Sequence, residues 1–291
     1  MRIPLVLLVL PALASCAASV DPGPLAGADP AAATVRAQER QRAATLYRDG
    51  LRLARGDGVA ADPERGGDMI RRAAELGHAE AQAFVGTSHL VGTVDASRAE
   101  AAAYWLERAA LQGHAGAARR LGRLHADGEG VPRDRAWSVV WLARAAERGD
   151  GEAQFELAML LIAGENTRHD MAEATAWLTR VAAAGHPDAA RYRDAAASKL
   201  SDGERADLAR HLERPLRRGA VANPDPPLLR FVQQALTSLG RDPGTVDGID
   251  GPATRRALAA FARDEKLPRA EGYVPAVLDR LRVRRRELAG G

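Results

Sequence analysis

A short stretch near the C-terminus combines glycines, acidic side chains and an arginine in a pattern that suits ligand binding. It runs Asp247-Gly248-Ile249-Asp250-Gly251 and is followed closely by Thr254 and Arg255. Backbone N–H groups in a glycine turn and at a helix start can bind anions, and an arginine can pair with a carboxylate. The same residue types also form turns and N-caps, so a purely architectural role is the alternative. The candidate binding residues are Asp247, Gly248, Ile249, Asp250, Gly251, Thr254 and Arg255.

Histidines are the other residues that could do chemistry. His78, His114 and His186 recur in steps of 36 residues, with Asp150 at the remaining step, and His89 and His125 are also 36 residues apart. In stacked helical units such residues are separated by about two helix diameters of about 8–10 Å each, too far to share an ion. No Ser-His-Asp, Cys-His or paired-carboxylate spacing stands out. We therefore expect no metal site, no cofactor and no catalytic residue.

The single cysteine, Cys16, follows an apolar run from Ile3 to Leu13 that is too short to span a bilayer. Such a run is typical of a secretory signal. The sequence Leu13-Ala14-Ser15-Cys16 resembles the lipobox of bacterial lipoproteins, in which the peptide is cleaved before the cysteine and the thiol is acylated. The alternative is ordinary secretion with cleavage after Ala14. Because Ala17 rather than aspartate follows the cysteine, the resemblance implies sorting to the outer membrane.

The centre of the chain is periodic. Trp105, Trp141 and Trp177 are 36 residues apart, and three further series keep the same step. A fixed period of this length indicates stacked supersecondary units rather than one globular core. Within one unit, apolar residues at helical spacing are followed by a glycine loop, a second helix and a glycine turn. The three further series are Gly77, Gly113, Gly149 and Gly185; Gly56, Gly92, Gly128 and Gly164; and Ala81, Ala117, Ala153 and Ala189.

This pattern resembles the Sel1-like repeats, which are relatives of the tetratricopeptide repeat. In the third unit the matching residues include Leu121-Gly122, Gly128-Glu129-Gly130-Val131, Trp141-Leu142 and Ala145-Ala146. The resemblance implies a helical-hairpin solenoid that binds partners through its surface. Ser201-Asp202-Gly203-Glu204 has a capping-box pattern, so a helix that covers the open end of the array should follow it.

The C-terminal part has a different pattern. An amphipathic helix with Leu228, Val232 and Leu236 precedes the glycine turn, Pro252 opens a second helix, and a third follows Pro275. Together with Val246-Asp247-Gly248-Ile249 and Gly251-Pro252-Ala253-Thr254-Arg255, these residues resemble the peptidoglycan-binding domain found on many cell-wall proteins. The chain departs from that family at Ala262 and at Gly272-Tyr273-Val274-Pro275, where other residues are usual.

These observations predict an all-α protein with a helical-hairpin solenoid of four 36-residue repeats and a helical cap, followed by a small three-helix domain. From residue 228 onward the chain holds 12 basic and 8 acidic residues, and the basic ones concentrate at the end. The expected divisions are a signal peptide at 1–15, a flexible tether at 16–34, the solenoid with its cap at 35–218, a proline-rich linker at 219–227, the peptidoglycan-binding domain at 228–284 and a basic tail at 285–291.

The expected function is that of a non-catalytic envelope lipoprotein. It would be lipid-anchored at Cys16 in the periplasm, bind peptidoglycan through its C-terminal domain and hold an unidentified protein partner on the solenoid. The alternative is a regulatory or localisation subunit that activates or positions a cell-wall enzyme or an envelope export complex. A wall hydrolase is a third possibility, but it requires a catalytic constellation that the sequence does not offer. Export and the small charge excess argue against nucleic acid as a partner.

Overall fold

The computed structural model describes residues 30–164, 170–214, 216, 226–267 and 273–289. All regular structure in these residues is helical, which confirms the predicted all-α class. The chain divides into two compact units, residues 1–39 and residues 40–291, and the second holds the repeats and the C-terminal helices. None of the helices in the described residues is both long enough and apolar enough to cross a membrane. Cys16 and the expected signal and tether segments up to residue 29 lie outside the described residues.

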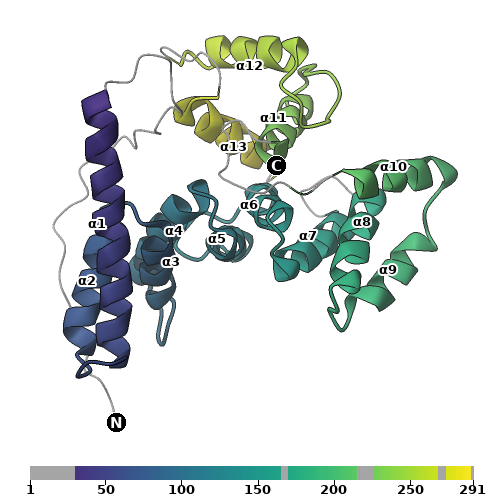
Figure 1. Cartoon of the computed structure of the whole chain (residues 1–291). Coiled ribbons are helices and arrows are strands. Elements are labelled where there is room, and N and C mark those ends of the chain that lie inside the picture. The colour runs from purple at the N-terminus through teal and green to yellow at the C-terminus, as the bar shows by residue number, and fades with distance from the viewer. Residues whose placement is uncertain (1–29, 165–169, 215, 217–225, 268–272, 290–291) are drawn as a thin grey trace. The chain divides into compact units, whose positions relative to one another are not determined.

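Ten helices form the repeat array, which we define as α1 to α10 (Figure 1). Most of these helices pack mainly on a neighbour in sequence, as expected for a solenoid, whereas α10 packs on α8. Their bounds are α1 Pro30–Arg55, α2 Pro63–Glu75, α3 Ala79–Ser88, α4 Ala96–Leu111, α5 Ala115–Asp127, α6 Arg135–Glu147, α7 Gly151–Ala163, α8 Met171–Ala183, α9 Ala189–Ala197 and α10 Asp202–Glu213.

The third unit shows why the sequence repeats. Helix α5 ends at Gly128, whose φ of 80° is left-handed and whose N–H donates to the carbonyl of Leu124. Helix α6 begins after Asp134, which accepts a hydrogen bond from the N–H of Trp137. Trp141 is 1% exposed, and the small side chains one turn further along α6 let neighbouring helices approach closely. The predicted succession of helix, glycine loop, helix and glycine turn is therefore confirmed.

Two of the recurrent histidines, His78 and His114, act as helix caps, whereas His186 accepts from the N–H of Asp188 at 3.3 Å, just before α9. The ring Nδ1 of His78 accepts from the N–H of Ala81 at 3.3 Å, and that of His114 accepts from Ala117 at 3.0 Å. At the equivalent position a carboxylate oxygen of Asp150 performs the same task. Because both side chains offer an acceptor to the third N–H of the helix, histidine and aspartate alternate at one repeat position.

The array ends in the helical cap that the sequence predicts. Ser201 and Glu204 form the complete capping box at the start of α10. This helix packs on α8 and ends at Glu213, before Pro215. At the other end, helix α1 begins at Pro30, five residues before the expected helical region. A proline is well placed at a first helical position, and an alanine run follows it.

The C-terminal domain contains α11 (Pro226–Ser238), α12 (Pro252–Asp264) and α13 (Pro275–Ala289). Its core includes Phe231, Leu236, Leu258, Phe261 and Leu281, each 3% exposed or less. Helix α13 extends into the segment 285–291, for which the sequence pattern predicts a basic tail. An amphipathic helix can continue here because the aliphatic stem of an arginine covers apolar surface while its charged head stays polar.

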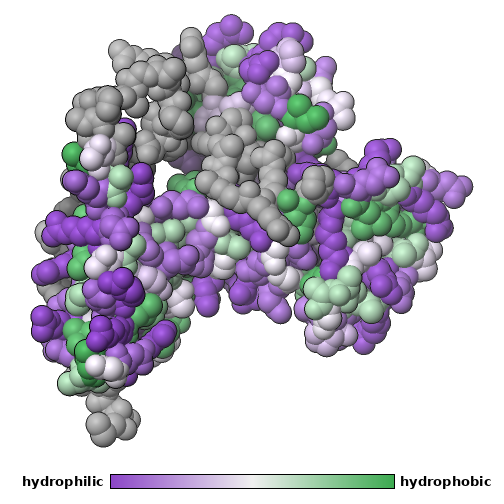
Figure 2. Space-filling view, in the orientation of Figure 1, coloured by the Kyte–Doolittle hydropathy of each residue, from purple (hydrophilic) through white to green (hydrophobic). Residues whose placement is uncertain are grey.

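Contacts also join the C-terminal domain to the middle of the array. The rings of Trp137 on α6 and Phe231 on α11 meet edge to face at 5.0 Å, and the Arg282 guanidinium lies 4.4 Å from the Trp137 ring centre. A 2.8 Å ion pair between Arg230 and Glu173 adds a polar contact to α8. We call this set of contacts the α6–α11 junction. The visible face of the molecule in Figure 2 is mainly hydrophilic, with small hydrophobic patches between.

Candidate functional site

The loop between α11 and α12 holds most of the predicted site residues and is organised by one buried glutamine. Gln233 is 1% exposed and lies on α11. Its amide oxygen accepts from the N–H of Gly248 at 2.9 Å, and its amide nitrogen lies 3.0 Å from Asp247 Oδ1 and 3.2 Å from the Ile249 carbonyl oxygen. Gly248 has a φ of 77°, so this turn requires glycine.

Asp247 and Thr254 complete the turn. Asp247 Oδ1 accepts from the N–H of Ile249 at 2.8 Å. Partial burial raises the pKa of Asp247. The hydrogen bonds from this N–H and from the Gln233 amide together lower it by more, so the pKa lies below its ordinary value. Thr254 is 1% exposed and donates to the carbonyl oxygen of Pro243 at 2.9 Å. Thr254 is thus placed to hold the loop, and its hydroxyl does not face solvent.

The remaining predicted residues are more accessible. Ile249 is 66% exposed, so its side chain is open to solvent beside the turn. Arg255 donates to Asp250 Oδ2 at 3.1 Å, and the hydroxyl of Tyr273 donates to Asp250 Oδ1 at 2.6 Å. Burial and this hydrogen bond raise the pKa of Tyr273, so the phenol stays protonated. Gly251 is the N-cap residue of α12 and makes no side-chain cap.

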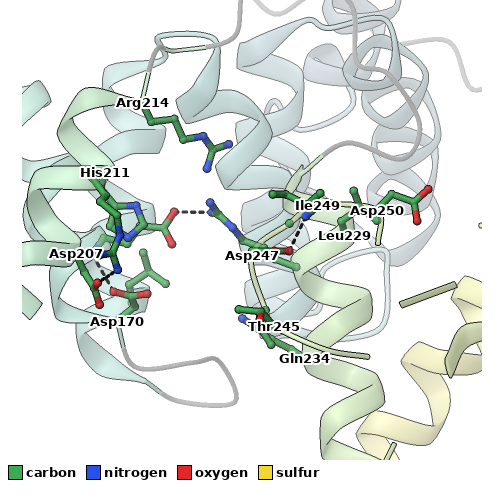
Figure 3. A pocket seen from close by; sticks show the side chains of 16 residues that line it. Asp170, Asp207, His211, Arg214, Leu229, Gln234, Thr245, Asp247, Ile249 and Asp250 are labelled. Atoms are coloured by element: carbon green, nitrogen blue, oxygen red, sulfur yellow. Dashed lines mark hydrogen bonds and ion pairs between the residues drawn. The ribbon is translucent and has the colours of Figure 1, made fainter. Parts of the chain in front are cut away.

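Four of the seven predicted residues line a cavity of about 740 Å³: Asp247, Gly248, Ile249 and Asp250. Gly251, Thr254 and Arg255 do not line it. The opposite wall belongs to the array. Figure 3 shows Asp170, Asp207 and His211 on that wall, facing Asp247 and Ile249 across the cavity.

The cavity walls carry both signs of charge. Arg230 and Glu173 form the 2.8 Å pair of the α6–α11 junction, and Arg214 pairs with Glu147 at 2.6 Å. Burial is the largest single effect on the pKa of Glu173 and raises it. The Arg230 guanidinium, together with His211, the Trp177 hydrogen bond and Arg214, outweighs burial and holds the pKa below its ordinary value. The walls therefore offer carboxylates, guanidinium groups and an exposed apolar side chain to a ligand.

Sequence reasoning missed several residues of this arrangement. Gln233 could have been noticed as a polar residue beside the apolar stripe of α11, but its partners come from a loop and a helix start whose placement the sequence does not fix. Tyr273 lies at a position where the chain departs from the family pattern. The array residues on the cavity wall could not be recognised as site residues from their neighbours in the sequence, because they reach the loop only through packing between segments that are far apart in the chain.

Two protein families match parts of this chain. Residues 43–78, 79–114, 115–150 and 151–186 match the family described as "Sel1 repeat". Residues 226–277 match the family described as "Putative peptidoglycan binding domain". The chain carries four Sel1 repeats and a peptidoglycan-binding domain. The four Sel1 repeats lie within α1 to α8, and the peptidoglycan-binding domain covers α11, the glycine turn, α12 and the start of α13.

Two solved structures are similar. A Sel1 repeat protein from Oxalobacter formigenes is 28% identical, covers 43% of this chain and 96% of its own, and has a TM-score of 0.38. The protective antigen c5321 of uropathogenic Escherichia coli strains, which displays an SLR fold, is 19% identical and has a TM-score of 0.39. That match covers 83% of this chain but only 52% of the antigen. A search of curated proteins gave no match.

The two family matches support a binding role. Sel1 repeats are protein-interaction motifs, and the other domain is named for its binding of peptidoglycan. Both kinds of module are typically non-catalytic. A peptidoglycan-binding domain also suggests association with the cell envelope.

Proposed function

We propose that this chain is a non-catalytic envelope lipoprotein that binds peptidoglycan through its C-terminal domain and holds a protein partner on its Sel1 repeats. The observation that carries the proposal is the loop at 242–251, which Gln233 fixes from inside while Asp247, Ile249 and Asp250 face the cavity. A rigid turn that presents polar groups and one exposed apolar side chain is suited to a ligand with sugar hydroxyls, amides and charged peptide groups.

Charge adds a second argument for this ligand. The peptides of peptidoglycan contain carboxylates, amides and free amines. Asp247 and Asp250 on the loop can accept from amines and amides, while Arg255 at the edge of the loop can donate to a carboxylate. The Arg255 side chain is more than half exposed in its ion pair with Asp250. Because an exposed ion pair contributes little free energy, a ligand carboxylate can bind the same guanidinium with little loss of stability.

The proposal is tested by sedimentation of the purified chain with cell-wall sacculi. We expect Ile249→Ser and Arg255→Ala each to lower the affinity for sacculi by about three- to tenfold, since each removes one exposed contact worth about 1 kcal/mol. Arg263→Ala is the matched control, because Arg263 is exposed and lies about two turns beyond Arg255 on α12, away from the loop. Unchanged binding of both loop variants, or equal loss in the Arg263 variant, would count against the loop as the binding site.

The lipid anchor is tested separately at Cys16. We expect Cys16→Ser to abolish metabolic labelling of the chain with radioactive palmitate and to move the protein from the membrane fraction to the soluble fraction, because the thiol carries the acyl group. Ser15→Ala leaves the thiol in place and should label normally. If the Cys16→Ser chain is still labelled, or if the wild type is not, the lipoprotein part of the proposal is wrong.

A further inference from the structure

Three potential metal ligands meet on the array wall of the cavity. Asp170 and Glu173 lie at the start of α8, three residues apart and therefore on one face of the helix. His211 lies on α10, which packs on α8. One ligand atom from each of the three side chains lies within 4.8 Å of the other two. All three belong to the array, and the packing of α10 on α8 brings them together.

The surroundings hold these side chains in place. Asp170 Oδ1 accepts from the N–H of Glu173 at 2.9 Å. Glu173 Oε1 accepts from Arg230 at 2.8 Å and lies 3.4 Å from the indole nitrogen of Trp177. The backbone carbonyl of His211 accepts from Arg180 at 2.5 Å, which fixes that turn of α10 against α8. Contacts of this kind orient metal ligands in known sites.

The three side chains are shielded from bulk water but remain open to the cavity. Asp170 is 8% exposed, and the Glu173 side chain is 12% exposed. His211 is also partly buried. All three residues line the cavity of about 740 Å³, so an ion can reach them from it.

We propose that Asp170, Glu173 and His211 form a binding site for a divalent transition-metal ion of the zinc class. The imidazole nitrogen argues against calcium and magnesium, which take oxygen ligands, whereas zinc accepts carboxylate oxygen and imidazole nitrogen together. Ligand atoms lie about 2.0–2.2 Å from zinc, so small side-chain rotations must draw the three groups together. Three protein ligands would leave a fourth coordination position open, and all three residues line the cavity.

The test uses the full purified chain after dialysis against a chelator. Titration with zinc by calorimetry, with metal analysis of the dialysed complex, should give one tightly bound zinc ion per chain. We expect His211→Gln and Asp170→Ser each to weaken zinc binding by at least about tenfold, because each removes a direct ligand. Serine is chosen at position 170 because its hydroxyl preserves the N-cap of α8.

His89→Gln is the matched control. His89 is a half-buried histidine at the end of α3, and its charged neighbours are Arg98 and Arg71 rather than carboxylates. Zinc affinity should be unchanged in this variant. Equal zinc binding by wild type and His211→Gln, an equal loss in His89→Gln, or tighter binding of calcium than of zinc would overturn the proposal.

A spectroscopic measurement guards against variants that fail to fold. Cobalt(II) added to the wild-type chain should give visible absorption bands of a low-coordinate ion, and Glu173→Gln should remove them while circular dichroism shows that the helices persist. If wild-type protein gives only the spectrum of hydrated cobalt, the site is not a transition-metal site.

Discussion

Replacing Gly130 with alanine is expected to lower the free energy of unfolding of the repeat array by more than about 3 kcal/mol. Gly130 has a φ of 68°, which alone costs an alanine about 1–2 kcal/mol. In addition, a Cβ at this position would lie 2.5 Å from the backbone nitrogen of Glu100 and closer still to the carbonyl group of Ala99. Both belong to helix α4, so a rigid helix would have to move. Chemical denaturation followed by tryptophan fluorescence measures the effect, because all four tryptophans lie in the array.

Gly58 is a matched control supplied by the repeat itself. It occupies the equivalent loop position two units earlier and has a φ of 72°, yet a Cβ there would meet nothing within 4 Å. Gly58→Ala should therefore cost only the conformational part, about 1–2 kcal/mol. Equal losses in the two variants would mean that the contact between the Gly130 loop and α4 contributes nothing to stability.

Replacing Gln233 with leucine is expected to cost the C-terminal domain about 2–4 kcal/mol and to reduce binding to sacculi by at least about tenfold. Leucine fills similar space but leaves the buried N–H of Gly248 without its acceptor. It also removes the amide donor from the Thr254 hydroxyl, which keeps its bond to the carbonyl of Pro243. Each such loss costs about 1–3 kcal/mol. Without its internal support, the loop also loses the fixed shape on which the proposed binding depends. Hydrogen exchange of residues 242–251 and sacculus sedimentation together measure the two effects.

The neighbouring Gln234 separates the amide network from a general effect on α11. Its side chain lies at the cavity wall (Figure 3) and is only partly buried. Gln234→Leu should change the free energy of unfolding by no more than about 0.5 kcal/mol. If the loop amides exchange hydrogen as slowly in the Gln233→Leu variant as in the wild type, the glutamine does not organise the turn.

The sequence alone sufficed for the fold because its signals are local and repeated. Glycines with positive φ, such as Gly128, mark the ends of helices wherever they recur, and the tryptophan at position 141 is buried as its spacing indicates. The capping box that the sequence predicts at Ser201 and Glu204 is present in the structure, with both of its hydrogen bonds. Such features depend on a few neighbouring residues, so a single sequence carries them.

The site was predictable only in part, for the opposite reason. The turn residues Asp247 and Gly248 could be found from their types, but not that Thr254 would be buried inside the turn rather than exposed beside it. Nor could the sequence predict the meeting of Asp170, Glu173 and His211. Asp170 occupies the N-cap position that Asp62 and Asp134 hold in other units, but Glu173 has no such counterpart and the histidine lies on a separate helix after the repeats. Their proximity is a result of tertiary packing, and contacts of that kind leave no periodic trace.

The α6–α11 junction has a consequence for how the chain folds. Contacts within the array join neighbouring helices and close only short segments of chain, so each unit can form against the next without a large loss of entropy. The junction instead joins Trp137 to Phe231 and must close a loop of almost a hundred residues. The junction should therefore form late in folding, after the array has folded and α6 is packed within it. During synthesis, the N-terminal units can be complete before the C-terminal domain has left the ribosome.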